Sequence, residues 1–552
     1  MTNTNESDIL IIGAGPVGLT LALDLAYRGV RSTVVERRRR GVLPEVKCNH
    51  TSARSMEIFC RLGLADTLRA AGLPPDFPHS VTYRTRTTGR ELCEIKIPSS
   101  AERFSCQDGA DCGWPTSEPP HRINQIYLEP ILFAAADAHP LIDIRSPLEF
   151  EDFTQDADGV TAHFTDLRAD TDMTIRARYL IGCDGARSRV RKQIGTRLEG
   201  DVVIQRTQST FIRAPGLIAA MKERPTWGMF SLNPDRVGNV YAIDGKETWL
   251  IHNYLKEDEE SFESVDRDRC IRQILGVDDN FEYTVISNED WYGRRMVAGR
   301  FRDRRVFICG DASHIWVPYA GYGMNAGIAD ATNLSWKLAA WANGWASADI
   351  LDSYESERKP ITEQVSYFVM DHSAKMANQR LSVPDNIEAE DAAGEAARKA
   401  LGQAAYELNV NQYAAAGLNF GYFYDHSPII AYDGAAHPGY TMSTFTSSTV
   451  PGCRTPHFPL PDGRSLYDAL GPEYSLMRLD PTVDVQPLLA AAHELGMPLT
   501  LLDVDPDDVP ADAGYAAPLV LSRPDWHVAW RGDRCPADPR ALLQKLTAQQ
   551  QH

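Results

Sequence analysis

Cysteine is scarce in this sequence, and no two cysteines stand in a CxxC pair or at the spacing of metal ligands. Ten cysteines are spread singly over 552 residues. Disulfide-rich secreted domains, dithiol enzymes and structural zinc sites all require paired or clustered cysteines. We therefore expect a cytoplasmic protein whose cysteines are reduced and which holds no metal.

Long apolar runs and an excess of basic residues are also missing. No stretch reaches the roughly 20 apolar residues of a membrane-spanning helix, and the first residues, MTNTNESDILIIGAG, lack the basic start of a signal peptide. Acidic residues number 75 and basic residues 56, so the formal net charge is −19. Such a charge repels nucleic-acid phosphates and anionic lipids. We expect neither a membrane nor a nucleic-acid partner.

The composition is that of a globular protein, and the chain is long enough for several domains. Of its 552 residues, 43% are hydrophobic and 24% are charged, which is ordinary for globular proteins and excludes wholesale disorder. Since the length exceeds what one hydrophobic core requires, two to four domains are expected. At the N-terminus, apolar runs at 8–12 and 32–35 flank a helical pattern at 16–28. This succession predicts a βαβ unit.

A glycine-rich loop joins the first strand of this unit to its helix. Its residues are Gly13, Ala14, Gly15, Pro16, Val17 and Gly18. Glycines at these positions let the backbone approach a pyrophosphate, and the helix N-terminus supplies amide donors. Glu36, at the end of the second strand, can accept hydrogen bonds from ribose hydroxyls. Gly13, Gly15, Pro16, Gly18 and Glu36 are therefore candidate dinucleotide-binding residues, although the loop does not separate FAD from NAD.

Two later motifs complete a recognisable pattern. One is DGARSRVR, which starts at Asp184; the other is CGDASH, which starts at Cys309 and is followed by PYAGYGMN at 318–325. Together with the N-terminal loop, they resemble the flavoprotein aromatic hydroxylases, single-component FAD monooxygenases of the para-hydroxybenzoate and phenol hydroxylase type. The resemblance over these motifs spans residues 8–338.

The resemblance places FAD between the N-terminal loop and the third motif. Asp311 corresponds to the aspartate that binds the ribityl and pyrophosphate part of FAD, and the loop with Pro318 and Gly321 corresponds to the one that lies against the isoalloxazine. The helix after it opens with Gly323, Met324 and Asn325. Amides there can stabilise negative charge on a reduced flavin. The loop departs from the family's usual GGQGMN, since it contains AGYGMN.

Five further residues are candidates for holding the cofactor. They are Arg37, Lys47, Arg54, Gln125 and Asp184. Asp184 lies in the segment that the family uses for FAD and NAD(P)H, and Gln125 in the segment whose glutamine contacts the flavin. Lys47, seven residues before Arg54, stands where the family usually has an arginine near FAD; it keeps the charge without the bidentate fork. Arg37 opens a basic run that either pairs with a phosphate or forms a solvated loop.

The candidate catalytic residues are His50, Pro318 and Tyr322. Pro318 and Tyr322 belong to the loop that the resemblance places against the flavin. Histidine titrates near neutral pH, and His50 is expected to assist deprotonation or orientation of a phenolic substrate; a surface or hydrogen-bonded histidine is the alternative. The aromatic candidates for a substrate wall, with core packing as the alternative, are Tyr241, Trp249, His252, Tyr254 and Trp291.

The predicted fold class is α/β: a Rossmann-like FAD-binding domain with an inserted β-sheet substrate domain, followed by a C-terminal thioredoxin-like domain without CxxC. The segments PGCRTP at 451–456 and SRPDWHVAWR at 522–531 carry the last assignment. They resemble the C-terminal domain of the phenol hydroxylase and polyketide oxygenase branches. The predicted parts are 1–78, 121–195 and 293–400 for FAD binding, 79–120 and 196–292 for the substrate domain, and 401–552 for the C-terminal domain.

The resemblance implies an FAD-dependent monooxygenase that uses NADPH or NADH and O2, by way of a flavin hydroperoxide, to hydroxylate an aromatic, phenolic small molecule. Two alternatives stay open. One is a flavin epoxidase or Baeyer–Villiger-type oxygenase acting on a polyketide, and the other is a non-catalytic FAD-bound carrier of a reactive intermediate. A monomer or a homodimer is expected, and the sequence names neither the substrate nor the preferred nicotinamide cofactor.

Overall fold

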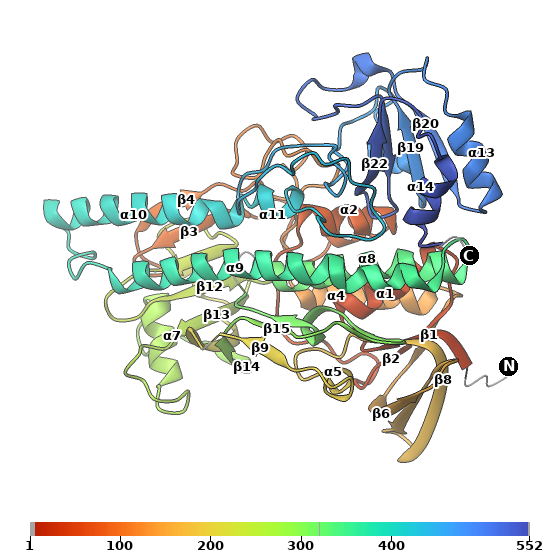
Figure 1. The fold of residues 1–552 in the computed structure, drawn as a ribbon. Coiled ribbons are helices and arrows are strands. Elements are labelled where there is room, and N and C mark those ends of the chain that lie inside the picture. Colours follow the sequence, from red (N-terminus) through yellow and green to blue (C-terminus); the bar gives the residue numbers. More distant parts are fainter. Residues whose placement is uncertain (1–5, 202, 319–320, 550–552) are drawn as a thin grey trace.

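The computed structural model describes residues 6–201, 203–318 and 321–549, which form three packed parts (Figure 1). The first domain is built on a largely parallel sheet, the sheet domain on a seven-stranded sheet, and the C-terminal domain on a four-stranded sheet. Two long helices, α8 (Tyr322–Ala342) and α9 (Ser353–Leu381), run through the middle of the molecule.

The first domain contains the predicted βαβ unit and confirms the Rossmann-like α/β prediction. Its parallel strands lie in the order β17-β8-β1-β2-β5. The strands are β1 (Glu6–Ile12), β2 (Ser32–Val35), β5 (Ile142–Arg145), β6 (Leu148–Gln155), β7 (Val160–Asp166), β8 (Thr171–Gly182), β16 (Arg302–Asp303) and β17 (Val306–Ile308). Strands buried on both faces read as continuous apolar runs, which is why β1 and β2 were visible in the sequence.

Short helices and turns complete this domain. They are α1 (Pro16–Tyr27), α2 (Ala53–Arg61), α3 (Ala65–Arg69), α4 (Gln125–Ala138), α5 (Arg189–Gln193), η1 (Gly310–Ala312) and η3 (Ala348–Asp352). Helix α1 packs between α4 and α8. A small sheet of β9 (Leu198–Gly200), β15 (Met296–Ala298) and β18 (His314–Ile315) leads toward the sheet domain.

The sheet domain joins two segments that are far apart in the chain. Its strand order is β14-β10-β13-β12-β11-β3-β4. The strands are β3 (Val81–Arg84), β4 (Glu91–Ile95), β10 (Gln205–Arg213), β11 (Gly228–Ser231), β12 (Gly238–Ala242), β13 (Thr248–Tyr254) and β14 (Thr284–Gly293), with α6 (Leu217–Ala220) and α7 (Arg267–Leu275). Helix α10 (Ala392–Tyr413) packs on β4 and crosses the predicted domain boundary between 400 and 401.

The strand register shows which side chains lie on each face of this sheet. His252 on β13 lies opposite Asn239 on β12, and because side chains alternate along a strand, Tyr241 shares that face. On the other face, a Cβ on Gly238 would come within 2.4 Å of Ile274, so α7 covers that side. Trp249 is three residues before His252 on β13, so its side chain lies on the face that α7 covers, and it is 0% exposed. We call the side that carries His252 the inner face.

The C-terminal domain has the predicted thioredoxin-like arrangement. Its strand order is β20-β19-β21-β22, in which β19 and β20 run parallel and the other pairs antiparallel. The elements are α12 (Leu466–Leu470), β19 (Tyr474–Arg478), α13 (Gln486–Glu494), β20 (Leu499–Asp503), η4 (Pro506–Asp508), β21 (Leu519–Ser522), β22 (Val528–Gly532) and α14 (Pro539–Leu546), preceded by α11 (Ala416–Phe420). Cys453 and Cys535 are both free thiols.

One hydrophobic core runs through both the first domain and the C-terminal domain. It includes Leu10 and Ile181 of the parallel sheet together with Leu476 of β19. The rings of Trp336 on α8 and Tyr474 on β19 meet edge to face, with centroids 6.1 Å apart. The C-terminal domain is therefore part of the main folding unit rather than an appended module.

The expectation that all ten cysteines are reduced is wrong for one pair. Cys106 and Cys112 form a disulfide, with their Cα atoms 6.0 Å apart. The chain turns back between them, where the amide of Cys112 donates to the carbonyl of Gly109. This turn, rather than any recognisable motif, brings the two thiols together. The other eight cysteines are free.

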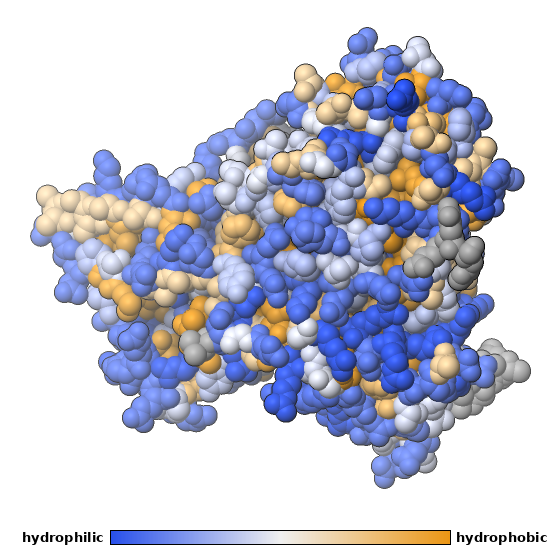
Figure 2. Space-filling view, in the orientation of Figure 1, coloured by the Kyte–Doolittle hydropathy of each residue, from blue (hydrophilic) through white to orange (hydrophobic). Residues whose placement is uncertain are grey.

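Polar side chains dominate the visible surface. Figure 2 shows hydrophilic residues over most of one face, with apolar residues in scattered groups. Within the described part of the chain, no helix combines the length and the apolar character needed to cross a membrane.

Candidate FAD and substrate site

The N-terminal loop has the geometry of a pyrophosphate cradle. Gly13 has φ +107°, and a Cβ there would lie 2.4 Å from the Cys183 carbonyl oxygen; one on Gly18 would lie 2.0 Å from the Gly13 oxygen. A Cβ on Gly15, in contrast, would meet no atom within 4 Å. Helix α1 starts at Pro16 without a side-chain cap, so its first amides point into this open space.

Glu36 closes the loop from the second strand. Its Oε2 accepts a hydrogen bond from the amide of Ala14 at 2.8 Å, and its Oε1 accepts one from the amide of Arg38, also at 2.8 Å. Arg38 additionally pairs with Glu129. Arg37, the residue expected from the sequence, has a 74% exposed side chain 3.6 Å from Glu149. The arginine at the loop is therefore Arg38.

Two substitutions separate the cradle's packing from its ligand contacts. Gly15→Ala is expected to leave the stability of the apoprotein unchanged but to weaken FAD binding roughly tenfold or more, because the methyl group would occupy space left for a pyrophosphate. Gly18→Ala is expected to lower stability by about 1–3 kcal/mol, since its Cβ would collide with backbone. Thermal unfolding of the apoprotein and FAD titration would measure the two effects. Normal FAD affinity in Gly15→Ala would contradict this placement.

Asp311 lies on η1, next to the start of α1: a Cβ on the preceding Gly310 would lie 3.0 Å from Val17. Its side chain is solvent-accessible, yet protein surrounds the carboxyl closely enough that burial raises its pKa, an effect that His314 and Lys47 oppose. Accessibility combined with close protein surroundings is typical of a side chain that faces a cleft. Lys47 donates to Glu45 at 2.5 Å and to Glu289 at 2.8 Å. Because Glu289 belongs to β14, Lys47 connects the first domain to the sheet domain.

Three other candidate cofactor residues have different surroundings. Arg54 on α2 lies over the ring of Tyr422, 4.7 Å from its centroid, and its buried Nη1 has no partner within the described residues. Gln125 opens α4 and donates to Glu129 at 3.0 Å. Asp184 accepts from two amides at the start of α5, while its buried Oδ1 has no partner in the described chain. Asp184 thus caps α5 with one oxygen and keeps the other available.

The loop before α8 is locked by a single asparagine. Asn325 Nδ2 donates to the carbonyls of His50 at 3.0 Å and Gly321 at 2.6 Å, while its Oδ1 accepts from Ser52 and Ser55. Gly321 has φ +64°, which favours glycine. The side chain of Asn325 is therefore fully used within the protein, and only its backbone amide is left for a ligand.

The other loop candidates differ in exposure. Pro318 is exposed, next to residues 319–320, which lie outside the described chain. A Cβ on Gly323 would meet no atom within 4 Å, and Met324 is half-buried against the main core. Tyr322 is only 6% exposed, and its hydroxyl has no partner within the described residues. Burial keeps the pKa of Tyr322 well above its usual range, so this hydroxyl stays protonated.

His50 lies beneath Gly321 and is held by a buried arginine. Arg122 Nη1 donates to Nδ1 of His50, and a Cβ on Gly321 would come within 2.7 Å of the Cβ of His50. Arginine can only donate, so Nδ1 is an acceptor and the ring proton resides on Nε2. Burial, followed by the charge of Arg122, holds the pKa of His50 well below its usual range. His50 is therefore a neutral hydrogen-bond donor at neutral pH.

Arg122 itself is a buried charge without a carboxylate of its own. It is 2% exposed, its Nε and Nη2 have no partner within the described residues, and burial lowers its pKa to about 10. The neighbouring Asp111 is already paired with Arg103 at 2.6 Å. The guanidinium of Arg122 lies 4.6 Å from the centroid of the Trp227 ring. It places a fixed positive charge directly behind His50.

A row of aromatic rings continues from Trp227 across the inner face. Ring centroids are 5.1 Å apart from Trp227 to Tyr241, 5.8 Å from Tyr241 to His252, and 5.9 Å from His252 to Trp291. His252 is only partly buried, yet burial lowers its pKa to about 4, which again is typical of a cleft. Trp249, on the opposite face, is a core residue. Neighbouring rings are inclined to one another by 47°, 72° and 79°, so the row provides a wall of tilted aromatic rings next to the His50–Arg122 pair.

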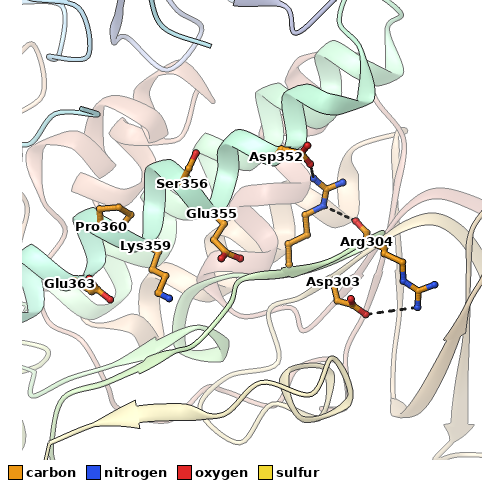
Figure 3. A pocket seen from close by; sticks show the side chains of 9 residues that line it. Asp303, Arg304, Asp352, Glu355, Ser356, Lys359, Pro360 and Glu363 are labelled. Atoms are coloured by element: carbon orange, nitrogen blue, oxygen red, sulfur yellow. Dashed lines mark hydrogen bonds and ion pairs between the residues drawn. The ribbon is translucent and has the colours of Figure 1, made fainter. Parts of the chain in front are cut away.

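An open groove elsewhere does not belong to this site. About 690 Å³ in volume, it lies between α9 and β16 (Figure 3). Arg302 pairs with Asp352, and Arg304 lies 4.0 Å from Asp303. The residues that line it are charged or small, with no aromatic ring among them, so the groove lacks the flat contact surface that a ring-shaped substrate needs.

The residues around the cleft fit FAD. The open space at Gly15, the uncapped N-terminus of α1 and the accessible carboxylate of Asp311 suit the two ends of a dinucleotide. The unpartnered buried atoms of Arg54 and Asp184 remain for further contacts. The sequence did not single out Arg38, Arg122 or Trp227. Arg122 precedes Gln125 in the same segment, but nothing local marked it as the partner of His50.

Comparison with known proteins agrees with this geometry. A family model of the FAD binding domain matches residues 6–369, and a model of the aromatic-ring hydroxylase C-terminal domain matches residues 448–549. The FAD-dependent monooxygenase apdD of Emericella nidulans is 30% identical, covering 96% of this chain and 88% of that protein.

Two solved structures are similar over nearly the whole chain. The rebeccamycin biosynthetic enzyme RebC with reduced flavin superposes with a TM-score of 0.87 at 31% identity, covering 98% of this chain and 99% of that one. Aklavinone-11 hydroxylase with FAD and aklavinone gives a TM-score of 0.81 at 26% identity, with full coverage of both chains, 100% each. Fold and site together define an FAD-dependent monooxygenase. The chain belongs to the flavin-dependent aromatic-ring hydroxylases, as its motifs predicted.

Proposed function

We propose that this protein hydroxylates a phenolic, ring-shaped small molecule with NAD(P)H and O2. The observation that carries the proposal is the aromatic row on the inner face, which ends at the buried Arg122 and the neutral donor His50 beneath the Gly321 loop. The similarity to aklavinone-11 hydroxylase, whose structure holds FAD and aklavinone, supports a pocket of this kind. When bound, FAD would supply the redox chemistry by which electrons from NAD(P)H activate O2.

The protein's own residues bind the cofactor, orient the substrate and exclude water from the site. The loop 13–18, Glu36 and Asp311 hold the cofactor, and the amides that open α8 favour negative charge at its edge. The aromatic row packs against the substrate ring. His50 Nε2–H donates to the substrate oxygen, and Arg122 behind it favours the ionised form of that oxygen. Pro318 and Tyr322 shape the loop; neither acts as a proton donor or acceptor.

The remaining assignments are proposals of the same kind. NADH or NADPH is the reductant, and the molecule is a monomer or a homodimer. Eight of the ten cysteines are free, and the Cys106–Cys112 disulfide is the exception; from the eight free thiols we propose the cytoplasm. Comparing NADH with NADPH as reductant, and measuring the mass in solution, would decide the first two points.

A substrate panel tests the proposed reaction. The FAD-loaded protein is mixed with simple and polycyclic phenols, and NAD(P)H oxidation, hydrogen peroxide and product mass are recorded. A hydroxylase shows substrate-stimulated NAD(P)H oxidation and a product that has gained one oxygen on the intact ring. A ring-expanded ester or an epoxide would indicate the Baeyer–Villiger or epoxidase alternative. No stimulation by any compound, together with tight binding of one of them, would support the carrier alternative.

His50→Ala is expected to retain FAD and its reduction by NAD(P)H, but to slow hydroxylation by about 10- to 100-fold. Without the Nε2 donor, the substrate oxygen loses its partner, and a larger share of NAD(P)H oxidation ends in hydrogen peroxide. The ratio of product to NAD(P)H consumed measures this coupling.

His50→Gln is the matched control, because its amide can donate a hydrogen bond but cannot take up a proton at neutral pH. Partial recovery of coupling in His50→Gln supports a donor role. If the glutamine variant is as impaired as the alanine variant, orientation by a donor is excluded and a base is required.

A further inference from the structure

The segment SRPDWH of the C-terminal domain forms a buried ion network that the reaction does not use. Arg523, 1% exposed, makes a bidentate pair with Glu357 on α9, with Nη1–Oε1 2.6 Å and Nη2–Oε2 3.0 Å. Its Nε donates to Asp525 at 3.0 Å. Lys337 on α8 donates to the same Glu357 at 2.8 Å. Two cations and two carboxylates thus balance one another between the C-terminal domain and helices α8 and α9.

The next residue on α9 reaches the turn that carries Asp311. Arg358 Nε donates to Oδ1 of Asp330 at 2.8 Å, and Oδ2 of Asp330 accepts from the amide of Gly310 at 3.2 Å and from His314 at 2.6 Å. Asp330 is 0% exposed. Its carboxylate therefore ties both ends of the Gly310–His314 turn to α9.

We propose that the C-terminal domain positions the FAD site through this chain of contacts, with Arg523 as the positioning residue. Arg523 fixes Glu357, and the adjacent Arg358 then has one orientation in which to hold Asp330. Replacing a buried ion pair by apolar residues is often neutral for stability, so orientation of α9 is what this network adds. The inference rests on the assignment of Asp311 and its turn to FAD binding.

The double variant Arg523→Gln/Asp525→Asn tests the proposal, because it removes one cation and one carboxylate and leaves the Lys337–Glu357 pair balanced. Apoprotein is titrated with FAD by flavin fluorescence, and unfolding is followed separately by circular dichroism. We expect roughly tenfold weaker FAD binding at temperatures where the variant is fully folded. Flavin release should also precede unfolding on heating.

Glu473→Gln is the matched control. Glu473 pairs with Arg28 at 3.4 Å and joins the same two domains, but at the C-terminal end of α1, away from Asp330. FAD affinity in this variant is expected to equal that of the wild type. An equal loss of affinity in both variants would show a general effect of domain contact and would overturn the proposal.

Two further outcomes keep the test decisive. Unchanged FAD affinity in the folded double variant would also overturn the proposal. If the double variant does not fold, Arg523→Lys, which keeps the charge but loses the bidentate fork, replaces it, with weaker FAD binding expected and unchanged binding overturning the proposal. Wild-type FAD affinity in Asp311→Ala would instead refute the assignment of the turn on which the inference rests.

Discussion

Removal of residues 448–552 is expected to leave no soluble, folded protein. The first domain and the C-terminal domain share one hydrophobic core, so truncation would expose a large apolar surface and promote aggregation. Truncation would also leave Glu57 without Arg454, its buried partner at 2.6 Å. Breaking a buried ion pair by removing one partner costs about 3–5 kcal/mol, a large part of the stability of most domains.

Expression of residues 1–447, followed by fractionation and size-exclusion chromatography, measures the effect. Arg454→Met in the full chain separates the two causes, since it removes the charge and keeps the apolar area. We expect this variant to fold with reduced stability. A truncated protein that is monodisperse and binds FAD would contradict the shared core.

The protein is expected to lose stability as the pH falls by one unit from 6.5, a range in which most carboxylates do not yet titrate. His121 and His527 are buried, and burial lowers their pKa values to about 3 and about 4. In the unfolded chain both return to about 6.5, so below that pH the unfolded chain takes up protons that the folded protein does not bind. At pH 6.5 half of the unfolded imidazoles are already protonated, so each histidine lowers the free energy of unfolding by about 1 kcal/mol over that unit. Together the two histidines lower it by about 2 kcal/mol.

The buried carboxylates act in a different pH range. Burial opposes ionisation of Glu357, but Arg523 and Lys337 hold its pKa at about 2. Its contribution is therefore present above its unfolded value of 4.5 and is lost only as the pH falls further. The loss of stability just below pH 6.5 consequently belongs to the buried histidines.

Urea unfolding in excess FAD, at pH 6.5 and one unit below, measures this effect. His121→Gln should reduce the change in midpoint, whereas His426→Asn should not, because the side chain of His426 is 83% exposed. A midpoint that stays constant over the unit would show that the folded protein binds these protons after all.

The sequence by itself determined the βαβ unit, the cofactor and the family. These depend on local features: a buried strand is a short apolar run, and a pyrophosphate loop needs glycine where a Cβ would collide, as at Gly13 and Gly18. The motif around Asp311 is equally local. Such features can be recognised in the sequence because the residues that act together are neighbours in the chain.

The surroundings of each candidate site residue were decided by the tertiary structure. His50 is a donor because Arg122, 72 residues away, occupies its Nδ1. Strand register placed His252 on the inner face and Trp249 on the other, and a shift of one residue would reverse that assignment. Arg523 meets Glu357 across 166 residues. No local pattern records these pairings, because a hydrogen bond or an ion pair depends on where the folded chain brings two groups, not on their distance along the sequence.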